Sequence, residues 1–277
     1  MYYINNLIKN TNQYHSILNN IQLKTSASVA VILRWDPKYL IETNKKTIVD
    51  DNDDKKKLKE GKSNLQILFA QRKFSKELCF PGGKIELNEN MIEAAERETQ
   101  EEVSIDLSNR NNYSLIARLD DKKTFDKLNV HSFVYFQQCQ QTPPIKLSEN
   151  ELIDYQWINL DEFLSISDSI TKVKLSEISK SRRLKNPLLY YLCSLVYVPF
   201  LRLPHPKNPN FILWGLTLDI TADLVRRMKD QKLSFIETTK SNNRKFSIFL
   251  YRYFPYSIIL SGLFLIFFVI YLIKLFM

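Results

Sequence analysis

The sequence predicts an α/β domain followed by one apolar segment that is long enough to cross a membrane. Three observations carry this prediction: apolar, β-branched runs alternate with helical patterns, a pair of glycines precedes a glutamate-rich helix, and an uncharged stretch follows a basic one. Of the 277 residues, 44% are hydrophobic, which is ordinary for a globular protein and sufficient for a sizeable core. The length allows one large domain or two small ones, and the order of the elements favours one, over residues 25–235.

The first part of the chain predicts two strands that flank a charged insertion. Residues 1–24 are polar and rich in asparagine, and we set them apart from the domain as a segment compatible with one helix. Residues 26–36, SASVAVILRWD, are apolar and β-branched and predict a strand, as do residues 65–73. Residues 44–64 are charged and poor in apolar side chains, which predicts a disordered insertion between two paired strands.

The rest of the domain continues with strands and ends with a helix. Residues 112–120 and 129–139 predict two strands, and residues 151–164 predict a strand that passes into a short helix. Ile220, Leu224 and Met228 recur at helical spacing, which predicts an amphipathic helix over residues 219–228. Pro199 interrupts the apolar residues 187–204, and this run predicts a core element rather than a membrane span.

A transmembrane helix is predicted over residues 254–274. Residues 254–273 carry no charge, and a helix of that length spans about 30 Å, the thickness of the hydrocarbon core. A buried core helix is the alternative, but the run is apolar on all faces. The basic linker at residues 236–253 favours a single-pass tail anchor with the domain in the cytosol, and peroxisomal, outer mitochondrial and endoplasmic reticulum membranes all stay open. The N-terminus lacks the pattern of a signal peptide.

The charge balance and the cysteines narrow the class of protein. A formal net charge of +9 suits a phosphorylated small molecule, anionic lipid or nucleic acid, although a general bias of composition is the simpler explanation. No helix-turn-helix, zinc-binding or aromatic RNA-binding signature is present, so we expect no nucleic-acid partner. The three cysteines are scattered and fit neither a metal-binding spacing nor a disulfide framework, which indicates a reducing compartment.

The stretch from Phe80 to Ile105 indicates chemistry rather than packing alone. Asn90 and Glu93 predict the capped start of a helix. One side of this helix carries a stripe of residues expected to be buried, and roughly 100° around the helix lie three carboxylates that share one face. The stripe consists of Ile92, Ala95, Thr99 and Val103, and the carboxylates are Glu98, Glu101 and Glu102.

Three carboxylates on one helical face indicate a cation site. Left alone, such groups repel one another by roughly 0.2–0.5 kcal/mol per pair. Hard oxygen ligands without Cys or His suit Mg²⁺ or Mn²⁺. The preceding PGGK, residues 81–84, supplies a glycine turn whose backbone can approach a ligand closely. A solvated acidic face is the alternative, and the glycine pair together with Glu89 at a fixed offset favours the metal site.

One spaced motif resembles the signature of the Nudix hydrolases: Gly83, five residues, Glu89, seven residues and then RETQEEVSI. The resemblance implies a Nudix α/β/α sandwich with a mixed sheet, and an enzyme that cleaves a diphosphate linked to another group X. Two positions depart from the signature: Thr99 stands where a larger aliphatic residue is usual, and Ser104 stands where the family has glycine. Because serine enters the left-handed conformation less readily than glycine, we expect a different loop after the helix.

The resemblance also implies roles for individual residues. Glu98 and Glu102 would be the principal ligands of Mg²⁺ or Mn²⁺, and Glu101 an additional ligand or the residue that activates water. Glu89 and Arg97 would form a supporting pair that orients the helix. Substrate contacts are expected from the glycine turn and the strand before it, at Arg72, Gly82, Gly83 and Lys84.

The flanking segments resemble the coenzyme A diphosphatase subfamily of the Nudix hydrolases. LFAQRKFSKELCFPGGK keeps Arg72 and the CFPGG turn but lacks the Leu-Arg step and a glycine of that subfamily, and residues 198–217 carry its Pro-Phe, Arg-Leu-Pro and Trp-Gly-Leu-Thr sequences. Glu151 is the implied late carboxylate, with Glu149 as its rival. The implied reaction is hydrolysis of coenzyme A or acyl-CoA to 3′,5′-ADP and (acyl-)4′-phosphopantetheine.

Two other interpretations stay open at this point. One is a Nudix hydrolase that acts on another nucleoside diphosphate derivative, such as ADP-ribose or NADH. The other is a non-catalytic, membrane-tethered binding module on a Nudix fold. The second is disfavoured because Glu98, Glu101 and Glu102 are all present.

Overall fold

The computed structural model describes residues 2–11, 26–38, 64–124, 128–167, 171–178, 190–191, 194–195 and 197–229. The chain divides into two compact units, residues 1–233 and 234–277, and every described residue belongs to the first. The predicted linker and transmembrane helix therefore lie outside the described residues, as does nearly all of the predicted insertion. Within the described ranges, no helix is long and apolar enough to cross a membrane.

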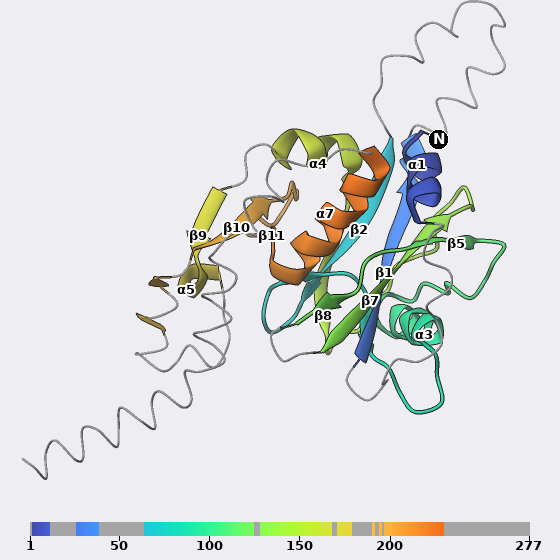
Figure 1. Ribbon diagram of the computed structural model, residues 1–277, viewed down its shortest axis with the longest axis horizontal. Helices are drawn as coiled ribbons and strands as arrows, with labels where there is room; N and C mark the ends of the chain where they lie inside the picture. The colour runs from blue at the N-terminus through green and yellow to red at the C-terminus, as the bar shows by residue number, and fades with distance from the viewer. Residues whose placement is uncertain are drawn as a thin grey trace, which may run out of the picture. The chain divides into compact units, whose positions relative to one another are not determined.

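A mixed sheet of eight strands forms the centre of this unit (Figure 1). Strand β1 (Ser26–Trp35) pairs in parallel with β7 (Asn129–Gln137) and antiparallel with β2 (Leu65–Arg72). Strand β5 (Tyr113–Arg118) pairs with β7, and β8 (Leu152–Asn159) pairs with β2. The short strands β3 (Leu78–Cys79), β4 (Gly82–Lys84) and β6 (Lys122–Lys123) pair with β2, β1 and β7. The predicted mixed sheet and its long strands are confirmed.

Both faces of the sheet are covered, which explains why its strands are apolar almost throughout. Helix α3 (Met91–Val103) packs on the face that carries Ala30, Ile32 and Tyr135. Because side chains alternate along a strand, Val31 and Leu33 point to the opposite face, and both are fully buried as well.

The insertion joins two paired strands, as predicted. Leu33 of β1 lies opposite Ile67 of β2, and the Asp36 N–H donates to the Asn64 carbonyl at 2.7 Å. This bond ties the two ends of the connection together, so an insertion there leaves the pairing of β1 and β2 intact.

Helix α1 (Tyr2–Thr11) packs against α7 (Gly215–Lys229), which contains the predicted amphipathic segment 219–228. The side-chain amides of Asn6 and Asn10 donate to the carbonyls of Met228 and Arg227 at 3.1 and 2.9 Å, and so satisfy carbonyls at the C-terminal end of α7. This packing makes α1 part of the compact unit, whereas the sequence-based division sets residues 1–24 apart.

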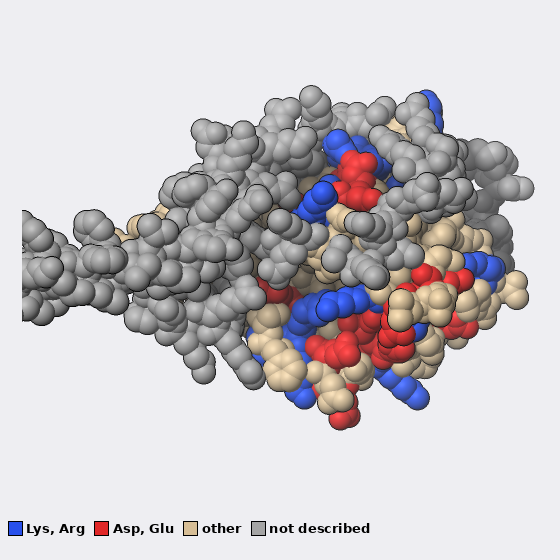
Figure 2. Space-filling view, turned by 60° about the horizontal axis from the view of Figure 1, so that its bottom comes forward, with Lys and Arg blue, Asp and Glu red and all other residues tan. Residues whose placement is uncertain are grey.

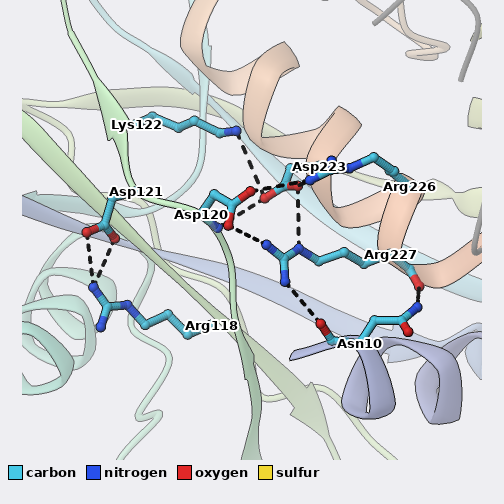
Figure 3. Close-up of polar contacts among 8 residues, drawn as sticks. All are labelled: Asn10, Arg118, Asp120, Asp121, Lys122, Asp223, Arg226 and Arg227. Atoms are coloured by element: carbon cyan, nitrogen blue, oxygen red, sulfur yellow. Dashed lines mark hydrogen bonds and ion pairs between the residues drawn. The ribbon is translucent and has the colours of Figure 1, made fainter. Parts of the chain in front are cut away.

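A polar network joins α7 to the segment that follows β5 (Figure 3). Asp223 of α7 accepts the Asp120 N–H at 3.1 Å, and the Arg227 guanidinium contacts the Asp120 carboxylate at 2.6 Å. Burial alone would raise the pKa of Asp223, but Lys122 and Arg227 outweigh burial and the pKa is lowered. The neighbouring Asp121 instead pairs with Arg118 at 3.0 Å.

A smaller antiparallel sheet follows the main one. It consists of β9 (Thr171–Lys174), β10 (Tyr197–Arg202) and β11 (Ile212–Trp214). Helix α4 (Leu160–Ser167) precedes β9 in the chain, and the short helix α5 (Leu175–Ile178) lies between β9 and β10. The prediction of a core element over residues 187–204 is wrong for part of the run. Leu201 and Leu203 are buried, but Tyr190, Tyr191 and Leu195 are exposed, because only the later residues join this narrow sheet.

Candidate active site

The predicted glycine turn, residues 81–84, contains the short strand β4, which pairs with β1 and packs against α3; we keep the name glycine turn for this segment. Its geometry explains both glycines. Gly82 has a φ of +150°, and a Cβ there would lie 2.2 Å from the Ser28 carbonyl oxygen. A Cβ on Gly83 would lie 2.3 Å from Oε1 of Glu98. The Ser28 backbone blocks a side chain at Gly82, whereas a side chain at Gly83 would displace the Glu98 carboxylate, so the turn brings bare backbone up to the acidic helix.

Helix α3 begins as predicted, at Asn90. The Asn90 side chain accepts from the N–H groups of Ile92 and Glu93, while the Glu93 carboxylate accepts the Asn90 N–H at 2.8 Å, which completes a capping box. Ala95, Thr99 and Val103 are fully buried against the sheet, whereas Ile92 is half-buried.

The three carboxylates of α3 do not share one environment. Glu102 is only 2% exposed, the side chain of Glu98 is 16% exposed, and that of Glu101 is 59% exposed. The turn at residues 81–84 covers one edge of the helix, and Glu102 lies under it. Its Oε2 accepts the Gly82 N–H at 3.1 Å.

Glu102 forms a carboxyl pair with Glu151, which comes directly before β8. Burial, together with the neighbouring Glu151, raises the pKa of Glu102 to about 8. The hydrogen bond from Gly82 and the charge of Arg72 oppose this effect. At neutral pH the pair therefore binds a proton unless a cation takes its place.

Arg97 connects the glycine turn to the helix. Its guanidinium forms a two-point contact with Glu89 at 3.0 and 2.8 Å and donates to the Lys84 carbonyl at 3.1 Å. It also contacts Glu98 and Glu101, each at 3.1 Å. Hydrogen bonds from Arg97 lower the pKa of Glu89, which accepts the Glu86 N–H as well. The implied supporting pair is thus in contact.

Hard oxygen donors gather at the turn, and this donor set fits a divalent cation. Glu151 lies within electrostatic reach of both Glu98 and Glu102, and burial raises the pKa of each of these two carboxyls. Among the described residues, no three acidic, His or Cys side chains form a ready-made metal cage. Arg97 contacts both Glu98 and Glu101. Nudix hydrolases generally use divalent metals such as Mg²⁺ or Mn²⁺.

The structure distinguishes Glu151 from its rival. The Lys73 N–H donates to the Glu151 carbonyl at 2.7 Å, and Lys73 Nζ donates to the Glu149 carbonyl at 2.8 Å. These two bonds fix the turn at residues 149–151, so that the Glu151 carboxyl lies against the Glu102 carboxyl. The sequence analysis does not identify this role of Lys73, since nothing local in the sequence reveals its contact with a residue 76 positions away.

The remaining predicted residues surround this centre. Arg72 lies at the exposed end of β2, within electrostatic reach of Glu102 and Glu151. Lys84 is exposed at the end of β4. Figure 2 shows acidic and basic side chains side by side on one face of the molecule, rather than a uniformly basic patch.

Ser104 takes the conformation that the signature glycine would take. It ends α3 in the left-handed region at φ 59° and ψ 31°, and its N–H donates to the Gln100 carbonyl at 3.1 Å. The Ser104 hydroxyl also donates to the Lys146 carbonyl at 3.3 Å. The expected change of the loop is therefore not seen in the backbone of this cap.

A family model, the NUDIX domain, matches residues 58–177. Solved Nudix structures resemble parts of the chain at low identity. The C. elegans Ap4A hydrolase in a binary complex is 18% identical, with a TM-score of 0.35, over 52% of this chain and 86% of that one. The E. coli dihydroneopterin triphosphate pyrophosphohydrolase is 16% identical, with a TM-score of 0.32, over 64% and 99%.

The Nudix domain of Shewanella oneidensis NrtR complexed with ADP ribose is 13% identical, with a TM-score of 0.32, over 52% of this chain and 79% of that one. No curated protein sequence matches the chain. The family match shows that the chain contains a Nudix domain. It is an enzyme of the class that hydrolyses phosphoric anhydrides.

Proposed function

We propose that this enzyme hydrolyses the diphosphate bond of coenzyme A or acyl-CoA to 3′,5′-ADP and (acyl-)4′-phosphopantetheine. The observation that supports diphosphate hydrolysis is the gathering of Glu98, Glu102 and Glu151 around the Gly82–Gly83 turn. Such a site offers carboxylates for a cation, with the basic side chains of Arg72 and Lys84 nearby for phosphate oxygens.

The choice of coenzyme A is supported by contacts between the segments that resemble its diphosphatases. The Thr217 hydroxyl donates to the Leu78 carbonyl at 2.8 Å, directly before the CFPGG turn. The side chain of Asn208 donates to Gln71 at 2.9 Å, beside Arg72. Residues 198–217 and the strand ends that lead into the glycine turn therefore lie together, although more than 100 residues separate them.

Each group at the turn has a role in this proposal. Glu98, Glu102 and Glu151 would hold the divalent cation, which when bound polarises a phosphoryl oxygen and lowers the pKa of water. Arg72 and Lys84 bind phosphate oxygens, and the absence of a side chain at Gly83 leaves room for the Glu98 carboxylate. Arg97 orients the helix through Glu89, and Glu101 stays a candidate for activating water at the exposed edge.

A product assay tests this proposal. The full-length chain, solubilised in detergent with Mg²⁺, is incubated with coenzyme A, acyl-CoA, ADP-ribose and NADH, and the products are identified by mass. We expect 3′,5′-ADP from coenzyme A or acyl-CoA as the fastest reaction. Release of AMP from ADP-ribose or NADH, with coenzyme A left intact, would instead support the other nucleotide substrates.

We also propose that residues 254–273 span a membrane, with the enzyme domain facing the cytosol. The support is the uncharged length of this segment and the basic residues Arg244, Lys245 and Arg252 before it. Extraction of membranes with alkaline carbonate should leave the chain in the pellet, and protease added outside the organelle should digest the domain. Release into the supernatant would contradict the proposal.

A further inference from the structure

Glu96 links the acidic helix to the sheet on the side away from the glycine turn. Its Oε1 accepts the Tyr135 hydroxyl at 2.9 Å and an Arg110 Nη2–H at 2.6 Å. The Glu96 side chain is only 12% exposed. Neither the stripe of buried residues nor the Nudix signature predicts a carboxylate at this position.

Both partners of Glu96 are themselves fixed. Tyr135 is fully buried on β7, and burial raises its pKa, so its hydroxyl stays protonated and donates to the carboxylate. Arg110 also donates to the Leu107 carbonyl at 2.7 Å, in the loop that follows α3. Glu96 therefore joins α3 to the central sheet and to its own following loop.

The helical period places Glu96 and the metal-binding edge on opposite sides of the buried stripe. At roughly 100° per residue, Glu96 lies roughly 160° from Glu98 around the helix, and Thr99 lies between them, facing the sheet. The Gly82 N–H holds one edge of the helix through Glu102, and Tyr135 holds the other through Glu96. A helix held at both edges cannot roll about its axis without breaking one of these contacts.

We propose that Glu96, together with Tyr135 and Arg110, is a positioning residue that fixes the roll of α3 and so keeps Glu98 and Glu102 beside the glycine turn. This role rests on the proposed function, since it concerns the same cation site. Groups that orient metal ligands from behind commonly change metal affinity or activity by roughly 10–100-fold when they are lost.

The chain offers a matched pair of tyrosines for the test. Tyr135 and Tyr113 are both buried in the core beneath α3, but the Tyr113 hydroxyl has no hydrogen-bond partner among the described residues. Tyr135→Phe removes the contact to Glu96, and Tyr113→Phe removes an unused hydroxyl from the same layer. Each variant keeps its ring, so packing is preserved.

Mn²⁺ titration of the full-length chain in detergent, followed by electron paramagnetic resonance, measures the site without requiring turnover. We expect Tyr135→Phe to weaken Mn²⁺ binding about tenfold and to lower kcat by a similar factor, with KM nearly unchanged. Tyr113→Phe should match the wild type. Equal Mn²⁺ affinities for wild type and Tyr135→Phe would overturn the positioning role.

Two substitutions of Glu96 distinguish a role in positioning α3 from a role in stabilising the fold alone. Glu96→Gln keeps an oxygen acceptor for Tyr135 and should retain most of the Mn²⁺ affinity, whereas Glu96→Leu should lose it as Tyr135→Phe does. Identical behaviour of the two would contradict the proposal. An inactive wild type that binds Mn²⁺, with weaker binding in Tyr135→Phe, would sink the proposed reaction but support the positioning role.

Discussion

At the scale of single residues, burial distinguishes three carboxylates that helical spacing alone places on one face. Glu102 lies under the glycine turn beside Glu151, whereas Glu101 stays in solvent with Arg97. The pKa of Glu102 is about 8, far above its ordinary 4.5, because burial disfavours the charged form. A divalent cation reverses this preference, since it binds the charged form.

The raised pKa predicts how stability depends on pH in the absence of metal. The folded state binds a proton at the Glu102–Glu151 pair that the unfolded state releases, between pH about 4.5 and about 8. Stability is therefore highest below this window and falls as the pH rises through it. Thermal unfolding in EDTA should show this fall, and Glu102→Gln should remove most of it. A melting temperature that rises from pH 5 to pH 8 would contradict the account.

Substitution of Glu102 by glutamine should preserve the fold but remove most of the hydrolytic activity. Glutamine still accepts the Gly82 N–H and carries no buried charge, so we expect an unchanged melting temperature at pH 7 or a higher one. Loss of the carboxylate should lower Mg²⁺-dependent hydrolysis by at least about 100-fold. Normal turnover in this variant would refute the role of Glu102 as a metal ligand.

At the scale of elements, the glycine turn and α3 determine each other's position. The two glycines meet different neighbours, backbone in one case and a carboxylate in the other. Their substitution by alanine should therefore have different consequences.

Gly82→Ala should destabilise the fold by roughly 3 kcal/mol, because its Cβ would collide with the Ser28 carbonyl at a φ that alanine disfavours. Gly83→Ala should unfold at nearly the wild-type temperature but lose most activity, because its Cβ displaces the Glu98 carboxylate. Calorimetry and the product assay measure the two effects. A stable Gly82→Ala together with a fully active Gly83→Ala would contradict the described turn.

The elements themselves were predictable from local patterns. β-Branched apolar runs gave β1, β2, β5 and β7, and the Asn90 cap placed the start of α3. The burial of Glu102 was not predictable, because helical spacing defines angles between residues but not which angle a distant turn covers. The choice of Glu151 over Glu149 depends on Lys73, and the packing of α1 depends on asparagine contacts with α7, far along the chain.

At the scale of the whole molecule, the described elements all lie in the first unit, residues 1–233. Its sheet, its site and the packing of α1 on α7 are built from described residues of this unit. The second unit contains the predicted transmembrane helix. The two units should therefore be separable in function.

Deletion of the chain from Pro255 onward should give an enzyme that needs no detergent. We expect its kcat to stay within a factor of about two of the full-length chain, because the residues of the site belong to the compact unit 1–233. Sedimentation and the product assay measure solubility and activity. An aggregated or inactive product would show that the deleted segment belongs to the folded enzyme.

The central claim is that Glu98, Glu102 and Glu151 hold a divalent cation beside the Gly82–Gly83 turn. A crystal structure with Mn²⁺ tests it most directly, because the anomalous signal locates the ion. The account predicts a peak within ligand distance, about 2.0–2.3 Å, of carboxylate oxygens from at least two of these residues. A well-ordered site with no peak, and with Glu98 still paired to Arg97, would contradict it.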